Sequence, residues 1–141
     1  MDLGLLNEAR EKLDEIIDTL HKTTGNGQRR PRTYRQKARR DYLNVSKRRK
    51  PRRNIVRKAI KKQLQYVNRN LKIVDTMLQQ ENVDMELLCN RQQKLLETIR
   101  ILAEQQTRMY KTKTHSVEDR IVNLHQPHVR PIVRGKAGAA V

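Results

Sequence analysis

A long apolar stripe constrains the fold of this chain more than any other sequence feature. From Asn54 onward, apolar side chains recur in alternating steps of four and three residues, at Ile60, Leu64, Val67, Leu71, Val74 and Leu78. That spacing places them on one face of a helix and is typical of a coiled-coil-like seam. The pattern therefore predicts one long helix with a single apolar face.

A second stripe follows after a tight turn. The segment QQENVD at 79–84 is typical of a turn, with Asp84 as the cap of the next helix. That helix is predicted to extend to about Tyr110. Its apolar positions are Leu88, Leu95, Ile99, Leu102 and Met109. Two striped helices joined by so short a connection are expected to form an antiparallel hairpin. Gln92 and Gln106 occupy seam positions, where they either fix the register or lie at a wet edge.

The N-terminal residues 3–22 predict an amphipathic helix. Its apolar stripe consists of Leu6, Ala9, Leu13, Ile16, Ile17 and Leu20. Its acidic residues are expected to face outward, and they are Glu8, Glu11, Asp14, Glu15 and Asp18. Two interpretations of this acidic face stay open. It either packs beside basic residues of the same chain and neutralises them, or it is a solvated surface.

A further helix is predicted between these two regions. Residues 23–33 contain two Gly, an Asn and a Pro, which favour a linker. Helical character resumes at Tyr34, with Thr33 as the candidate cap. The predicted inner face consists of Tyr34, Ala38, Tyr42 and Val45. Lys50-Pro51 is expected to interrupt the helix, because the residue before a proline avoids the α region.

The composition favours slender helices over a thick mixed core. Hydrophobic residues make up 35% of the chain, which contains neither Phe nor Trp. Globular domains commonly reach about 45–50%, by a count that also includes Gly. The core must therefore be built from Leu, Ile, Val and a few Met. The predicted fold is mainly α, with three to four helices that include the long antiparallel hairpin.

The character of the sequence changes after Lys113. Residues 114–141 contain two Pro, two Gly and short β-branched runs. Residues 120–124 are predicted to form a strand, and 129–133 a second extended piece interrupted by Pro131. The chain is therefore expected to divide into a helical basic region, 1–113, and a short extended segment, 114–141.

The segment 29–62, called the basic segment below, dominates the charge. Seventeen of its 34 residues are Lys or Arg, and the whole chain carries a net charge of +17. Such density requires a polyanion or an acidic surface nearby, and the pI near 10.7 favours nucleic acid. Two other interpretations stay open: a solvated arm without a partner, and a targeting or RNA-binding segment. The candidate DNA-contacting residues are Arg29, Arg30, Arg32, Arg35, Lys37, Arg39, Arg40, Lys47, Arg48, Arg49, Lys50, Arg52, Arg53, Arg57, Lys58, Arg130, Arg134 and Lys136.

The sequence shows no pattern that favours catalysis. The spacing of His115, His125 and His128, even with Glu118 and Asp119, matches no zinc signature. Gly-Asn-Gly lacks the strand, Lys and helix of a phosphate-binding loop. The single cysteine, which follows two Leu, is expected to be a small semi-buried core residue in a reducing compartment. We assign no catalytic residue and no metal ligand.

The expected compartment is the cytoplasm. No apolar run reaches 18 residues, so no spanning helix is predicted. The N-terminus lacks the positive and apolar regions of a secretory signal. No stretch combines the charge with a bulky apolar face, and we therefore expect no membrane partner.

Three segments resemble bacterial insertion-sequence transposases of the DDE class. They are TYRQKARRDYLNVSKRRK at 33–50, KAIKKQLQYVNRNLKIVD at 58–75 and DRIVNLHQPHVRPIVRGKAGAAV at 119–141. The start, DLGLLNEAREKLDEIIDTL, is similar to the helix that follows the first catalytic strand in that family. The last segment is the most specific part of the resemblance, because basic helices alone are generic.

The resemblance implies an RNase H-like catalytic domain whose acidic residues bind two divalent ions, Mg²⁺ or Mn²⁺, to cut and join DNA. The first catalytic aspartate is expected upstream of Met1, and the remaining acids beyond Val141. We therefore expect a bacterial, nucleoid-associated DNA-binding fragment without its own cofactor or activity, whose C-terminal segment belongs to an RNase H-like sheet. The alternative is a helical interaction module that associates with itself or with a full-length transposase.

Overall fold

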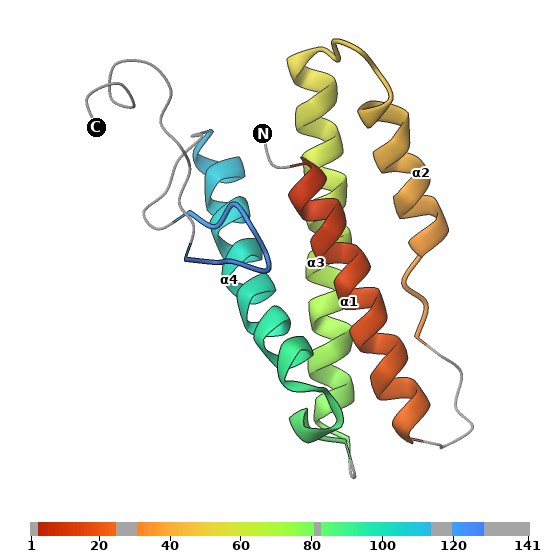
Figure 1. Cartoon of the computed structure of the whole chain (residues 1–141). Helices are drawn as coiled ribbons and strands as arrows, with labels where there is room; N and C mark the ends of the chain where they lie inside the picture. Colours follow the sequence, from red (N-terminus) through yellow and green to blue (C-terminus); the bar gives the residue numbers. More distant parts are fainter. Residues whose placement is uncertain (1–2, 25–30, 81–82, 114–119, 129–141) are drawn as a thin grey trace.

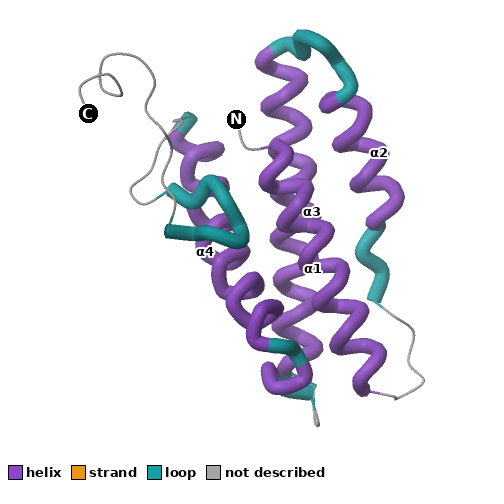
Figure 2. Tube along the Cα trace, in the orientation of Figure 1, coloured by secondary structure: helices purple, strands orange, loops and turns teal. Residues whose placement is uncertain are grey.

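The computed structural model describes residues 3–24, 31–80, 83–113 and 120–128, and within them it is built from helices (Figure 1). The elements are α1 (Leu3–Thr24), α2 (Arg35–Ser46), α3 (Arg53–Leu78), the 3₁₀ helix η1 (Met85–Leu87) and α4 (Asn90–Thr112). The predicted mainly helical fold is confirmed. Figure 2 shows helices and loops but no strand in the described parts of the chain.

The four α-helices form a bundle in which successive helices run in opposite directions (Figure 1). α1 and α3 lie together in the middle, and their mutual packing is the most extensive in the molecule. α2 flanks this central pair on one side and α4 on the other. Because the direction alternates, the central α1 and α3 run parallel, and the N-terminal helix covers the seam of the long one.

The predicted antiparallel hairpin is confirmed as α3 and α4. Near the turn, Arg100 forms an ion pair of 2.6 Å with Asp75. At the open end, Arg57 Nη2 donates to the backbone oxygen of Tyr110 over 2.8 Å. Because the residue number rises along one helix as it falls along the other, these two contacts fix the antiparallel register.

The predicted apolar stripes form the core. All six stripe residues of α1 are buried, and so are Leu88 and all four α4 positions of the second stripe. On α3, Leu71 and Leu78 are half-buried while the other four seam residues are buried. Burial of each such aliphatic side chain stabilises the fold by about 1.5–3 kcal/mol. The seam of the hairpin is thus covered within this chain, mainly by α1.

Gln106 does not lie at a wet edge, whereas Gln92 is half-buried. Gln106 is buried, with 4% of its surface exposed. Gln92 accepts the backbone N–H of Cys89 over 3.3 Å and donates to Thr19 Oγ1 over 3.0 Å. Gln92 therefore holds the start of α4 against α1. Cys89 is exposed at the N-cap of α4, so the expectation of a semi-buried core residue was wrong.

The boundaries of two helices differ from the expected ones. α2 begins at Arg35 rather than Tyr34, and Thr33 is buried instead of acting as the cap. Tyr34 occupies the N-cap position with φ 54° and ψ 34°, a left-handed conformation that costs an ordinary residue on the order of 1–2 kcal/mol. Asp84 does cap a helix, but the helix is η1: its side chain accepts the N–H of Glu86 over 2.8 Å.

The C-terminal residues 120–128 pack onto the bundle instead of forming the predicted strand at 120–124. Ile121 and Leu124 join the core, and the N–H of Ile121 donates to Gln105 Oε1 on α4 over 2.9 Å. Two apolar residues three apart enter the same core, which a strand with alternating sides does not allow. The second extended piece, 129–133, lies outside the described residues. No helix within the described ranges is long and apolar enough to cross a membrane.

Candidate nucleic-acid interface

Acidic and basic residues are concentrated on different helices of this chain. No Asp or Glu occurs between Asp41 and Asp75, and this acid-free span covers the second half of α2, the α2–α3 connection and most of α3. α1 instead carries five acidic residues. The longest stretch of uncompensated positive charge in the bundle therefore lies on the second half of α2, the connection and α3, where phosphate groups would be attracted.

The densest cluster covers the connection between α2 and α3 and the first residue of α3, residues 47–53, called the basic turn below. Its cations are all exposed, and they are Lys47, Arg48, Arg49, Lys50, Arg52 and Arg53. Pro51 separates the two helices and stiffens the connection. Arg48 Nε donates to the backbone oxygen of Asn44 over 3.3 Å, but no acidic residue of the described chain pairs with any of these cations.

A ridge of cations continues along the outer side of α3. It consists of Lys58, Lys61, Lys62, Arg69 and Lys72, all exposed. The most deeply buried residues of the helix, which include Gln63 and Val67, lie on the opposite side. Only Lys58 of this ridge was among the candidate residues. The sequence contains no Asp or Glu from Tyr42 to Val74, and this feature could have identified the other ridge residues as candidates.

The remaining candidates divide into exposed and internally bound side chains. Arg32, Lys37, Arg39 and Arg40 are exposed around α2. Arg35, in contrast, is half-buried and forms a bidentate pair with Asp18, with both N–O distances 2.9 Å. That hydrogen bonding raises the pKa of the Arg35 guanidinium above its ordinary value. Arg35 thus neutralises part of the acidic face of α1, the first of the two interpretations proposed for that face.

Arg57 is also used inside the fold. Its guanidinium lies over the ring of Tyr110, 4.1 Å from the centroid, in addition to its hydrogen bond to the backbone of that residue. Arg35 and Arg57 therefore position helices and are not available as DNA contacts in this arrangement. The candidates Arg29, Arg30, Arg130, Arg134 and Lys136 lie outside the described residues.

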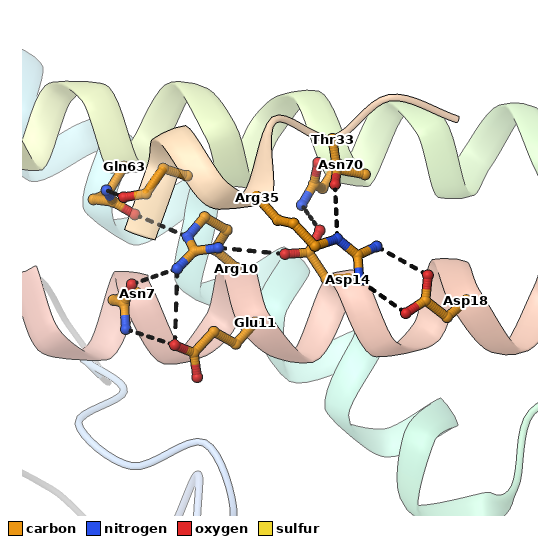
Figure 3. Close-up of polar contacts among 10 residues, drawn as sticks. Asn7, Arg10, Glu11, Asp14, Asp18, Thr33, Arg35, Gln63 and Asn70 are labelled. Atoms are coloured by element: carbon orange, nitrogen blue, oxygen red, sulfur yellow. Dashed lines mark hydrogen bonds and ion pairs between the residues drawn. The ribbon is translucent and has the colours of Figure 1, made fainter. Parts of the chain in front are cut away.

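A buried polar network fixes α2 and α3 against α1 (Figure 3). At its centre is Arg10, with only 2% of its surface exposed. Its Nη2 donates to Asn7 Oδ1 over 2.6 Å, its Nη1 to Asp14 Oδ2 over 3.3 Å, and its Nε to Gln63 Oε1 over 3.2 Å. Gln63 in turn donates to the backbone oxygen of Ala38 on α2 over 2.9 Å. One chain of contacts thereby links three helices.

Asp14 is part of this network, so the expectation that it faces outward was wrong. Its Oδ1 accepts from Asn70 Nδ2 on α3 over 3.1 Å, and 5% of the residue is exposed. Burial raises the pKa of the Asp14 carboxyl above its ordinary value, although Arg35 and Arg10 act in the opposite direction. Burial likewise lowers the pKa of Arg10. Arg10 was not singled out in the sequence and Asp14 was placed on the outer face, since spacing alone does not reveal which polar flank is covered.

Asp41, the only acid of the basic segment, is also held inside the bundle. It is half-buried and accepts a hydrogen bond of 2.8 Å from the hydroxyl of Tyr66 on α3. Burial, together with this bond to Asp41, raises the pKa of Tyr66 to about 12. The carboxylate therefore joins α2 to α3 instead of neutralising the basic turn.

The described residues contain no group of three or more His, Cys, Asp and Glu side chains suited to a metal ion. His125 Nε2 lies 3.2 Å from Glu8 Oε1, so it connects the segment 120–128 to α1. His128 is exposed. His115, Glu118 and Asp119 lie outside the described residues.

Comparisons with protein-family models, with curated proteins and with solved structures found no match for this chain. The resemblance to DDE transposases rests on the sequence segments quoted above and stays a prediction. The basic face, defined as the basic turn together with the exposed Lys and Arg of α2 and α3, is therefore interpreted from its own chemistry.

Proposed function

We propose that this chain binds duplex DNA through the basic face, as the helical DNA-holding part of a bacterial DDE transposase. One observation carries the proposal. The exposed cations of the basic turn and of the α3 ridge have no acidic partner in the described chain, whereas Arg10 and Arg35 do. Cations without internal partners repel one another, and phosphate groups relieve that repulsion.

The dimensions of α3 suit a duplex. From Arg53 to Lys72 the helix rises about 1.5 Å per residue and so covers about 29 Å. A DNA strand has one phosphate per about 3.4 Å, and the ridge therefore spans about eight base pairs. Lys and Arg that contact phosphates give affinity and orientation without reading bases. We accordingly propose binding with little sequence preference.

Cleavage is not part of the proposal. The acids that would hold two divalent ions need a cluster of oxygen ligands. The most buried carboxylate described, Asp14, is already bound by Arg10 and Asn70. This donor set does not fit a Mg²⁺ or Mn²⁺ site.

The alternative, an interaction module that pairs through the hairpin seams, is less well supported. Those seams are buried within the chain by α1 and by Ile121 and Leu124. The large apolar side chains left exposed in the described chain are Tyr34, Met85 and Ile101, which lie just before α2, in η1 and in α4. Sedimentation without DNA tests self-association, which would raise the apparent mass as the protein concentration increases.

The decisive experiment is the salt dependence of binding to a blunt duplex, measured by fluorescence anisotropy. If about six phosphates are neutralised, the plot of log K against log salt concentration should have a slope near −5. The double variant Arg48→Gln/Arg49→Gln should make the slope about 2 less negative.

The matched control is Arg91→Gln/Lys94→Gln. It removes the same charge from exposed positions near the start of α4, outside the basic face. This control should leave the slope nearly unchanged. A slope near zero for the unmodified protein, or equal changes in the two variants, would reject the proposed interface.

A further inference from the structure

Tyr34 lies at the entrance to α2 in a conformation that an aromatic residue rarely adopts. Its φ of 54° belongs to the left-handed region, where Gly or Asn is usual. It occupies the N-cap position but makes no side-chain capping bond, and 41% of its surface is exposed. The fold therefore uses neither its side chain as a cap nor its ring as a core residue. A strained, exposed aromatic residue of this kind points to a function.

Two guanidinium groups lie close to the ring. Arg69, from the α3 ridge, has its Cζ 4.8 Å from the ring centroid, and Arg32 has its Cζ at 5.8 Å. The ring also borders a surface hollow whose rim carries Lys37 and Arg40. Four exposed cations thus lie near Tyr34: Arg32, Lys37 and Arg40 line the hollow with it, and Arg69 contacts its ring from α3.

Another tyrosine–arginine pair in the same molecule shows what a structural pair looks like. Tyr110 and Arg57 are both half-buried, their ring-to-Cζ distance is 4.1 Å, and Arg57 also bonds the backbone of Tyr110. That pair joins the ends of α3 and α4. The Tyr34 ring is open to solvent, and its contacts with Arg32 and Arg69 are longer.

We propose that this hollow binds an unpaired nucleotide, whose base stacks on Tyr34 while its flanking phosphates contact Lys37 and Arg40. Bases stack on aromatic side chains, and guanidinium groups contribute additional contacts to a stacked base. A base inside a duplex is covered on both faces by its neighbours, so only an overhang, a frayed end or a single strand presents a base to Tyr34. This inference rests on the proposed DNA binding and names the form of DNA that the site prefers.

Two DNA hairpins of the same stem test the inference, one blunt and one with a short thymidine overhang, each titrated with the full chain. The unmodified protein should bind the overhang hairpin about tenfold more tightly. An overhang of abasic sugars, which keeps the phosphates but lacks the bases, should lose this gain. Equal binding to thymidine and abasic overhangs would overturn the proposal, because phosphate contacts alone would then explain the affinity.

Protein variants separate the site from the basic face. Tyr34→Asn removes the ring but suits the left-handed conformation, so it should fold at least as well as the unmodified chain. It should lose the preference for the overhang and keep its affinity for the blunt hairpin, while Tyr34→Phe keeps both. A Tyr34→Asn variant that still prefers the thymidine overhang would overturn the inference. Absence of any binding to the blunt hairpin by the unmodified protein would instead reject the proposed function itself.

Discussion

Arg10 and the arginines of the basic turn are the same residue type in opposite environments. Arg10 is almost fully buried and donates to Asn7, Asp14 and Gln63. Arg48 and Arg49 are exposed and have no acidic partner in the part of the chain that the structure describes. The contrast shows that the same charged group is bound by internal partners at one position and left open to solvent at the others.

The difference follows from the cost of removing a charge from water. A buried guanidinium is tolerated only when its N–H groups are hydrogen-bonded and an opposite charge is near. An exposed guanidinium needs no partner to remain in the fold, but it repels its neighbours. The partners of an arginine therefore indicate its role better than its position in a basic run.

The largest expected effect comes from breaking the buried pair. Asp14→Ala removes the buried counter-charge of Arg10 and leaves only the exposed Glu11 near it, and we expect the free energy of unfolding to fall by about 3–5 kcal/mol. Urea unfolding followed by circular dichroism measures this change. The double variant Arg10→Met/Asp14→Leu removes both charges and should be less destabilised than Asp14→Ala.

Glu11→Ala is the matched control for that experiment. Glu11 is an exposed acid on the same helix, 3.8 Å from Arg10. Its removal should change the stability by no more than about 0.5 kcal/mol. A loss of less than about 1 kcal/mol for Asp14→Ala would show that the network does not hold the helices together.

A smaller effect on stability is expected from the hydrogen bond between Tyr66 and Asp41. The folded state raises the pKa of Tyr66 from 10.0 to about 12, so the protonated phenol is favoured by folding. Because the folded pKa is the higher one, this contribution to stability is fully present below pH 10. It is lost as the pH rises to about 12.

Absorbance at 295 nm during alkaline titration tests this expectation. One tyrosine should ionise near pH 12, and Tyr66→Phe should remove that step. At neutral pH the same substitution should reduce the free energy of unfolding by about 1.5 kcal/mol, the usual contribution of a hydrogen bond to a carboxylate. Ionisation of every tyrosine near pH 10 would contradict the observed bond to Asp41.

Sequence patterns predicted the helices well because the apolar spacing fixes which face of each helix is covered. The six predicted core positions of α1 are all buried for that reason. The buried polar network was not predicted, because Arg10 and Asp14 lie at the edge of the stripe. Arg10 and Asp14 are buried because α2 and α3 pack across that edge of α1. The α3 sequence did contain a hint of this network. Gln63 and Asn70 are polar residues seven positions apart on one face of α3, and both are fully buried.

The failures at loops and ends have local causes. Thr33 is a good capping residue by type, but it is buried and its hydroxyl accepts from Arg35 Nε, and Tyr34 occupies the cap position in a left-handed conformation. The β-branched residues of 120–124 suggested a strand, yet no neighbouring strand exists among the described residues to pair with them. Of the candidate contact residues, Arg35 and Arg57 are bound internally, which depends on partners far away in the sequence.

The smallest expected effect on stability belongs to the basic turn. Arg48→Gln/Arg49→Gln removes two charges that have no acidic partner in the described chain, and it relieves repulsion within the turn. The free energy of unfolding should therefore change by no more than about 0.5 kcal/mol, with an increase favoured at low salt. The proposed function predicts that the same variant weakens DNA binding. A large loss of stability would mean that these arginines, like Arg10, serve the fold, and the distinction between buried and exposed cations would fail.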